Sequence, residues 1–239
     1  MADPRRLRFR FSKTGKIRFT SHRDVARMWE RALRRSGLPV AFSQGFSPHP
    51  LLSFGLALPT GCESRGEYLD ARLDEAGPDE VPLADLPGLL SELLPDGMAV
   101  QVVAPVAMAE SSLQQEVASC DWDLEVLGVE GEDLEERIGR MLAAPSLTVR
   151  RERKGRQTED DIRPAILGLA LTGHSGSEQG NIRAELATHP RGVRPGDLLS
   201  ALGTDVVLAR ACRTHQWIER DGARYEPLSV SGLGAGPAS

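Results

Sequence analysis

The sequence predicts an α+β protein made of two successive ferredoxin-like halves, each with the order β-α-β-β-α-β and a mainly antiparallel sheet. Three observations support this prediction. The same succession of strand-like and helix-like apolar periodicities occurs twice along the chain. A polar stretch at residues 109–115 separates the two occurrences. The composition, with 40% hydrophobic and 26% charged residues, is that of an ordinary globular protein. The predicted domains are residues 1–105 and 118–228. A tail rich in Gly, Ala and Ser, residues 229–239, is expected to be disordered.

The first predicted strand covers residues 5–12, where side chains alternate with a period of two. One face is apolar and the other is cationic, and the two sets are Leu7, Phe9 and Phe11 against Arg6, Arg8 and Arg10. We expect these arginines to point outward. Gly15 then supplies a tight turn, and residues 17–20 are expected to form a short second strand.

A helix is predicted to begin at Ser21, because Asp24 three residues later completes a capping box. It should end at Gly37, with Pro39 as the stop signal. The helix is amphipathic, and its arginines recur at spacings of three and four on the side opposite the apolar residues: Arg23, Arg27, Arg31 and Arg34.

The remaining elements follow from the same periodicities. In the first half, strands are expected at residues 40–43, 51–58, 67–73 and 99–104, and a helix at 83–94. In the second half, strands are expected at residues 121–126, 147–153, 162–171, 182–188 and 209–218, and helices at 132–143 and 195–202.

Charge is distributed unevenly along the chain. Residues 1–50 hold 12 Lys and Arg against 3 Asp and Glu, whereas residues 51–150 hold 5 against 20. Residues 151–239 are nearly balanced, with 12 against 11, and the whole chain has a net charge of -5. A basic segment in an acidic protein indicates either a positive surface for a partner or neutralisation between the two segments.

Several classes of protein lack support in the sequence. No window has the roughly 18 apolar residues that a membrane span needs, and the N-terminus lacks an apolar signal core, so we expect a cytoplasmic protein with no membrane partner. The three cysteines, Cys62, Cys120 and Cys212, are far apart and form no C-x-x-C pair. We therefore expect reduced, partly buried thiols, with no disulfide framework, no metal and no cofactor.

The most distinctive motif is the loop at residues 43–50, Ser-Gln-Gly-Phe-Ser-Pro-His-Pro. Its two prolines and its glycine rule out a regular strand and predict a shaped loop. Phe46 could stack on a base, and His49, held between two prolines, could donate a hydrogen bond or move a proton. The alternative is a rigid hairpin in which Phe46 packs into the core and His49 binds a backbone carbonyl.

A second motif surrounds Gly15. Lys13 and Lys16 flank this turn, and the helix N-terminus at Ser21 follows, which suits the binding of an anion. The spacing of a P-loop is absent. His22 lies in the first helical turn, where a capping or core role is the alternative.

No metal-hydrolase, esterase or deaminase motif occurs among the histidines. The best hypothesis for an enzyme is that His22 and His49 converge as an acid-base pair.

Four stretches together carry a resemblance to a known family. They are R-F-R-F-S-K-T-G-K-I-R-F-T-S-H-R-D at residues 8–24, R-A-L-R-R-S-G-L-P at 31–39, F-S-Q-G-F-S-P-H-P at 42–50, and L-S-F-G-L-A-L-P-T-G at 52–61. They resemble the radical-SAM-linked bacterial proteins, a family of unknown function. Two departures are Arg23, where an apolar residue is usual, and Leu51, where a basic residue often follows.

The resemblance implies association with a radical SAM protein that carries an iron-sulfur cluster. This chain lacks the closely spaced cysteine trio that such a cluster needs. Together with the basic segment and the aromatic loop, this predicts a non-catalytic accessory protein that binds RNA and presents it to its partner. The alternatives are an RNA-processing or RNA-modifying enzyme that uses His22 and His49, and a purely structural subunit that docks through its arginines.

Overall fold

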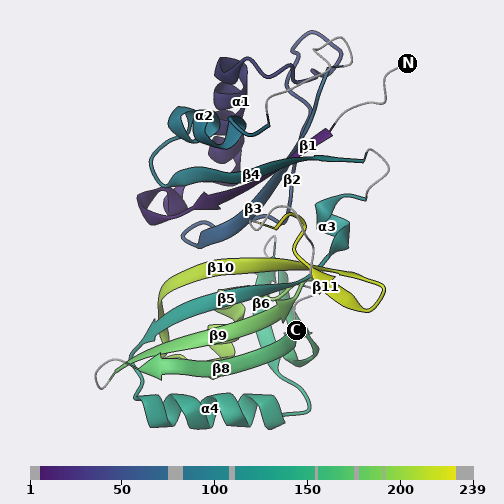
Figure 1. Cartoon of the computed structure of the whole chain (residues 1–239). Coiled ribbons are helices and arrows are strands. Elements are labelled where there is room, and N and C mark those ends of the chain that lie inside the picture. The colour runs from purple at the N-terminus through teal and green to yellow at the C-terminus, as the bar shows by residue number, and fades with distance from the viewer. Residues whose placement is uncertain are drawn as a thin grey trace. The chain divides into compact units, whose positions relative to one another are not determined.

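The computed structural model describes residues 6–74, 83–107, 111–153, 156–174, 178–190 and 192–229 (Figure 1). These residues form a mixed α+β fold with mostly antiparallel strands and few helices. The chain divides into two compact units. The N-terminal unit comprises Met1–Val117 together with Trp217–Ser239, and the central unit comprises Ala118–Gln216. The segment from Trp217 onward thus joins the N-terminal unit, whereas the predicted domain 118–228 assigned it to the second half.

The N-terminal unit contains an antiparallel sheet in the order β4-β1-β3, with β2 also paired to β3. Helices α1 and α2 cover one face of this sheet (Figure 1). The strands are β1 Arg6–Lys13, β2 Leu52–Phe54, β3 Glu63–Arg72, β4 Met98–Val106 and β11 Ala223–Tyr225. The helices are η1 Gly15–Phe19, α1 His22–Ser36, α2 Leu86–Leu93 and α3 Leu113–Glu116.

Helix α1 begins and ends at its predicted signals. The hydroxyl of Ser21 accepts a hydrogen bond from the Asp24 backbone N–H at 3.2 Å, which satisfies one of the N–H groups left free at a helix start. Gly37 adopts a left-handed conformation with φ of 74°, which residues other than glycine rarely take, and this ends the helix. Val25, Trp29, Ala32 and Leu33 are buried, so the apolar side faces the sheet as expected.

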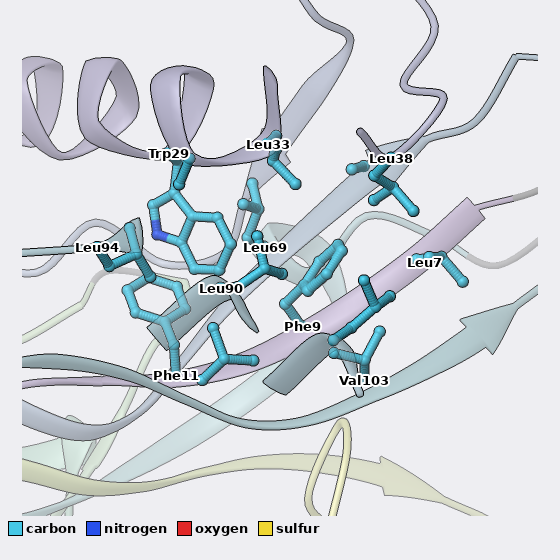
Figure 2. Close-up of a cluster of buried hydrophobic side chains, with 14 of the residues drawn as sticks. Leu7, Phe9, Phe11, Trp29, Leu33, Leu38, Leu69, Leu90, Leu94 and Val103 are labelled. Atoms are coloured by element: carbon cyan, nitrogen blue, oxygen red, sulfur yellow. The ribbon is translucent and has the colours of Figure 1, made fainter. Parts of the chain in front are cut away.

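The core of this unit lies between α1 and β1 (Figure 2). The Trp29 ring packs against Phe9 and Phe11, with centroid separations of 5.6 Å and 5.0 Å. Leu90 of α2 lies in the same cluster and is fully buried. The apolar face predicted for the first strand therefore forms the centre of the core. Burying such aromatic rings provides much of the energy that holds α1 against the sheet.

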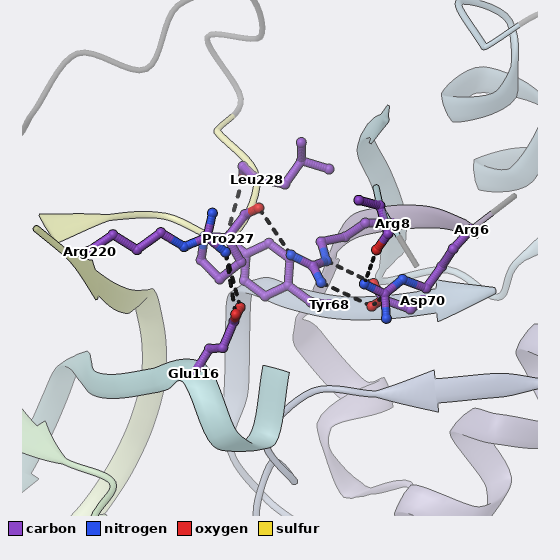
Figure 3. Close-up of polar contacts among 9 residues, drawn as sticks. Arg6, Arg8, Tyr68, Asp70, Glu116, Arg220, Pro227 and Leu228 are labelled. Atoms are coloured by element: carbon purple, nitrogen blue, oxygen red, sulfur yellow. Dashed lines mark hydrogen bonds and ion pairs between the residues drawn. The ribbon is translucent and has the colours of Figure 1, made fainter. Parts of the chain in front are cut away.

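The cationic face of β1 is not exposed, and the expectation that its arginines point outward is wrong. Arg8 and Arg10 are buried. The Arg8 guanidinium makes two hydrogen bonds to Asp70 of β3, at 2.8 Å and 3.0 Å (Figure 3). Arg10 forms an ion pair with Glu226 at 2.5 Å. The segment that follows β11 thus contributes acceptors to this face, including the Pro227 carbonyl near Arg8.

Residues 17–20 are also not a strand, because η1 is a 3-10 helix. The Lys13 ammonium donates to the carbonyls of Arg18 and Thr20, and these bonds hold the turn in a compact form. The predicted strand at 40–43 is reduced to two isolated bridges, Val40 with Leu73 and Phe42 with Pro50.

The central unit has the strand order β10-β5-β9-β8, with helices α4 and α5. The hairpin of β6 and β7 forms a separate two-stranded sheet. The strands are β5 Val117–Leu127, β6 Thr148–Arg153, β7 Arg156–Asp161, β8 Ile166–His174, β9 Gln179–Ala187 and β10 Val207–Arg220. The first residue of β5 and the end of β10 from Trp217 onward belong to the N-terminal unit. The helices are α4 Gly131–Ala143, η2 Arg163–Ala165 and α5 Pro195–Leu202. Helix α5 matches its predicted range, and η2 interrupts the strand predicted at 162–171. Apart from Ser229, the predicted tail lies outside the described residues.

Candidate functional site

The exposed side of α1 is covered by arginines. Arg23, Arg27, Arg31 and Arg34 are all exposed, and so is Arg35. Arg27 has one carboxylate partner, Asp24, at 3.4 Å. Among the described residues, no ion pair forms with Arg31 or Arg34. The helix therefore presents a row of guanidinium groups to solvent, as the sequence predicts.

The loop at residues 43–50 starts close to the C-terminal end of α1. The bridge between Phe42 and Pro50 closes its base. Phe46 is fully exposed at the tip, so the alternative in which it packs into the core is wrong. His49 Nδ1 lies 3.1 Å from the Ser43 hydroxyl and 3.3 Å from the Ser47 carbonyl oxygen. These contacts hold the loop in shape and leave the Phe46 ring free to stack.

Exposed phenylalanines flank α1 at both ends. Phe19 precedes the helix and is 63% exposed, and Phe42 follows it and is 43% exposed. The Arg18 guanidinium lies over the Phe19 ring, 4.8 Å from its centroid. With Phe46, the surface combines aromatic faces with cations, which is the combination that single-stranded nucleic acids bind. We call this set the α1 surface: Phe19, Arg23, Arg27, Arg31, Arg34, Arg35, Phe42 and Phe46.

The two predicted lysines have different surroundings. Lys16 is exposed. Lys13 is buried with its ammonium bound to two carbonyls, and burial lowers its pKa. The structure thus gives Lys13 a structural position in the N-terminal unit, although the sequence placed it among the anion-binding residues.

His22 and His49 have separate surroundings. The exposed His22 ring meets Phe54 edge-on, with centroids 5.0 Å apart, whereas His49 bonds within its own loop. The two side chains share no hydrogen bond or ring contact. His22 also lines a small pocket of about 20 Å³ with Lys13, Glu67 and Tyr68, a volume close to that of a single water site.

Among the described residues of the central unit, the open face of β5 has a different character from the α1 surface. Asp121, Asp123 and Glu125 alternate along this strand and are half-buried. Each has a partner within the unit: His215 at 3.7 Å, Arg183 at 3.5 Å and Gln179 at 2.7 Å, in that order. This face is acidic and internally paired, so it does not favour phosphate groups.

Three residues of the α1 surface were not predicted from the sequence. Phe19 belonged to an expected strand, and Arg35 was outside the counted arginine row. A signal existed for Arg35, which directly follows Arg34 of the predicted arginine row, and for Phe19, which lies between Lys16 and the predicted helix start at Ser21. Phe42 was placed in a strand and gave no separate signal.

Within the described residues, no group of three or more His, Cys, Asp or Glu side chains is placed to hold a metal ion. No helix in the described ranges has the length and apolarity needed to span a membrane.

The fold and the α1 surface define an α+β protein with an exposed cluster of arginine and phenylalanine side chains on its N-terminal unit. The family model described as "Uncharacterized protein conserved in bacteria (DUF2344)" matches residues 6–195. The chain therefore belongs to this family, and the match includes every residue of the α1 surface.

Two solved structures match this chain in part. One is titled "Crystal Structure of a Cbf5-Nop10-Gar1 Complex", with 10% identity, a TM-score of 0.47, and coverage of 87% of this chain and 49% of the other. The second is the "archaeal box H/ACA sRNP Nop10-Cbf5 complex", with 9% identity, a TM-score of 0.45, and coverage of 88% and 47%. This chain spans about half the length of the matched chain in each of these structures. Curated proteins gave no match.

Proposed function

We propose that this protein is a non-catalytic, cytoplasmic accessory protein that binds single-stranded RNA on the α1 surface and presents it to a radical SAM enzyme. The observation that carries the proposal is the row of exposed arginines on α1 between exposed phenylalanines. Guanidinium groups contact phosphates, and aromatic rings stack on bases whatever their sequence. The radical SAM partner is supported by the sequence resemblance of the loop and of the stretches on either side of it.

The strand orders fit the proposed architecture of two ferredoxin-like halves. The sheet of the N-terminal unit runs β4-β1-β3-β2, and that of the central unit runs β10-β5-β9-β8. If the β6-β7 hairpin is treated as an insertion and the remaining strands of each unit are numbered one to four along the chain, both sheets have the order 4-1-3-2. RNA-recognition modules with a four-stranded sheet often bind through aromatic residues on that sheet. Here the open face of β5 is acidic, so we assign the RNA to the helical side of the N-terminal unit.

The test is RNA binding by a charge-reversed variant. Arg27→Glu with Arg31→Glu changes two exposed guanidinium groups, so the fold should survive, because exposed substitutions usually change stability by about 0.5 kcal/mol or less. The slope of log affinity against log salt is negative, and each phosphate of a single strand that the protein no longer neutralises reduces its magnitude by about 0.7. The loss of two such phosphates should therefore reduce the magnitude by about 1.4. The measurement is fluorescence anisotropy of a labelled single-stranded RNA over a range of salt concentrations.

The matched control reverses two exposed arginines of the central unit, Arg140→Glu and Arg183→Glu. These side chains are each 66% exposed, and each has one carboxylate partner. The control should bind RNA with nearly the slope of the parent. If the parent binds no RNA at low salt, or if both double variants lose affinity equally, the proposal is wrong. The α1 surface would then be better interpreted as a docking site for an acidic protein.

A further inference from the structure

A pocket opens at the base of the 43–50 loop, within the N-terminal unit. It has a volume of about 230 Å³. Phe42 and Pro50, which close the base of the loop, both line it, and Leu33 and Val40 form further apolar walls. The pocket therefore adjoins both parts of the α1 surface, the arginine row and the aromatic loop.

Two charged residues of α1, Glu30 and Arg34, also line this pocket. They are separated by one helical turn, a spacing at which opposite charges commonly pair. No ion pair joins them, and no other described residue bonds to the Glu30 carboxylate. Glu30 is half-buried and its carboxylate oxygens are not buried unpaired atoms, so they stay accessible to a ligand in the pocket.

The volume of the pocket favours a small occupant. Sites for drug-sized ligands measure roughly 300–1,000 Å³, which is more than this pocket provides. One flat ring system is a better fit. The exposed side chain of Phe42 offers such a ring an aromatic wall.

The two charged side chains that line the pocket, Glu30 and Arg34, indicate which base fits. A carboxylate has only acceptors, and its two oxygens suit two neighbouring N–H donors. Among the four RNA bases, guanine alone has adjacent N–H groups on one edge, at N1 and N2. The next edge of guanine carries the acceptors O6 and N7, which arginine binds with its fork of donors.

We propose that this pocket binds a guanine base of the RNA, with Glu30 accepting from N1–H and N2–H and Arg34 donating to O6 or N7. The inference rests on the proposed function, because the arginine row must first hold the strand. Arg31 and Arg35 lie next to these residues on α1 and are exposed, so they remain available to the flanking phosphates. The protein would then prefer single-stranded RNA that contains an unpaired guanosine.

The experiment measures the affinity of the full chain for a short oligouridine and for the same oligomer with one central guanosine, adenosine, cytidine or inosine. The guanosine oligomer should bind roughly 5- to 150-fold more tightly than the oligouridine, the range expected for a bidentate base contact. Inosine lacks the N2 amino group, so it should lose most of this preference. Inosine that binds as tightly as guanosine would overturn the assignment of Glu30.

Glu30→Gln tests the residue directly, since an amide offers one acceptor where the carboxylate offers two. This variant should lose the guanosine preference and keep its affinity for oligouridine. Glu92→Gln, which changes an exposed carboxylate on α2, should keep the preference. If the parent binds oligouridine but does not distinguish the bases, the assignment of the pocket to guanine is wrong and the proposed function stands. If no oligomer binds, both are wrong.

Discussion

Replacement of Asp70 by alanine should destabilise the N-terminal unit strongly. Arg8 and Asp70 are 1% and 4% exposed, and they are joined by two hydrogen bonds of 2.8 Å and 3.0 Å. Arg6 lies 3.7 Å from the same carboxylate. Removing Asp70 takes both short hydrogen bonds and the paired carboxylate from the buried Arg8, whereas the bond to the Pro227 carbonyl is longer, at 3.5 Å. Removing one partner of a buried ion pair lowers the free energy of unfolding by about 3–5 kcal/mol.

Urea unfolding followed by tryptophan fluorescence measures this cost, because Trp29 lies in the core of the same unit. With a slope of about 2 kcal/mol per molar urea, the midpoint should fall by about 1.5–2.5 M. Glu159→Ala removes an exposed ion pair with Arg150, so it should change stability by about 1 kcal/mol or less.

The double variant Arg8→Met, Asp70→Leu removes both charges and should recover most of the lost stability. That recovery separates the cost of a buried cation that has lost its carboxylate partner from the cost of poorer packing. A midpoint for Asp70→Ala no lower than that of Glu159→Ala would refute the reasoning. So would a double variant as unstable as Asp70→Ala alone.

Two further predictions concern aromatic residues. Phe46→Ala should weaken RNA binding by about 1–3 kcal/mol, because a stacking ring is lost. It should leave the salt dependence of binding unchanged, because no cation is removed. The control in the same anisotropy assay is Leu167→Ala, which shortens another exposed apolar side chain. Burial raises the pKa of Tyr68 well above its usual value near 10. The folded protein therefore keeps this proton while the unfolded chain releases it, and stability falls as the pH rises past about 10. Tyr68→Phe lacks this proton, so its thermal midpoint relative to the parent should rise between about pH 9 and pH 11, and an unchanged difference would contradict the assignment.

Local signals predicted much of the secondary structure, because they act between near neighbours. The Ser21 cap, the Gly37 stop and the buried apolar face of α1 each depend on residues within a few positions along the chain. Helix α5 and the apolar face of β1 were predicted for the same reason. The exposed arginine row followed directly, since the polar side of an amphipathic helix faces water.

The arginines of β1 could not be placed from local sequence. Their partners are distant, since Arg8 pairs with Asp70, 62 residues away, and Arg10 with Glu226, 216 residues away. A period-two pattern shows which side chains share a face, but it does not show what covers that face. The segment that follows β11 contributes to that covering, and its return to the N-terminal unit has no local signal. The same holds for Lys13, whose position depends on the η1 turn.

Photo-cross-linking of RNA to the protein tests the account's central claim most directly. A labelled single-stranded RNA carrying photoreactive thiouridine is bound at low salt, irradiated and digested, and the modified peptides are identified by mass spectrometry. Bases stacked on Phe19, Phe42 or Phe46 lie next to those rings, so adducts should fall within residues 15–36 and 42–50 and disappear in the Arg27→Glu, Arg31→Glu variant. Adducts confined to residues 118–216, or adducts that persist unchanged in that variant, would contradict the assignment of the RNA to the α1 surface.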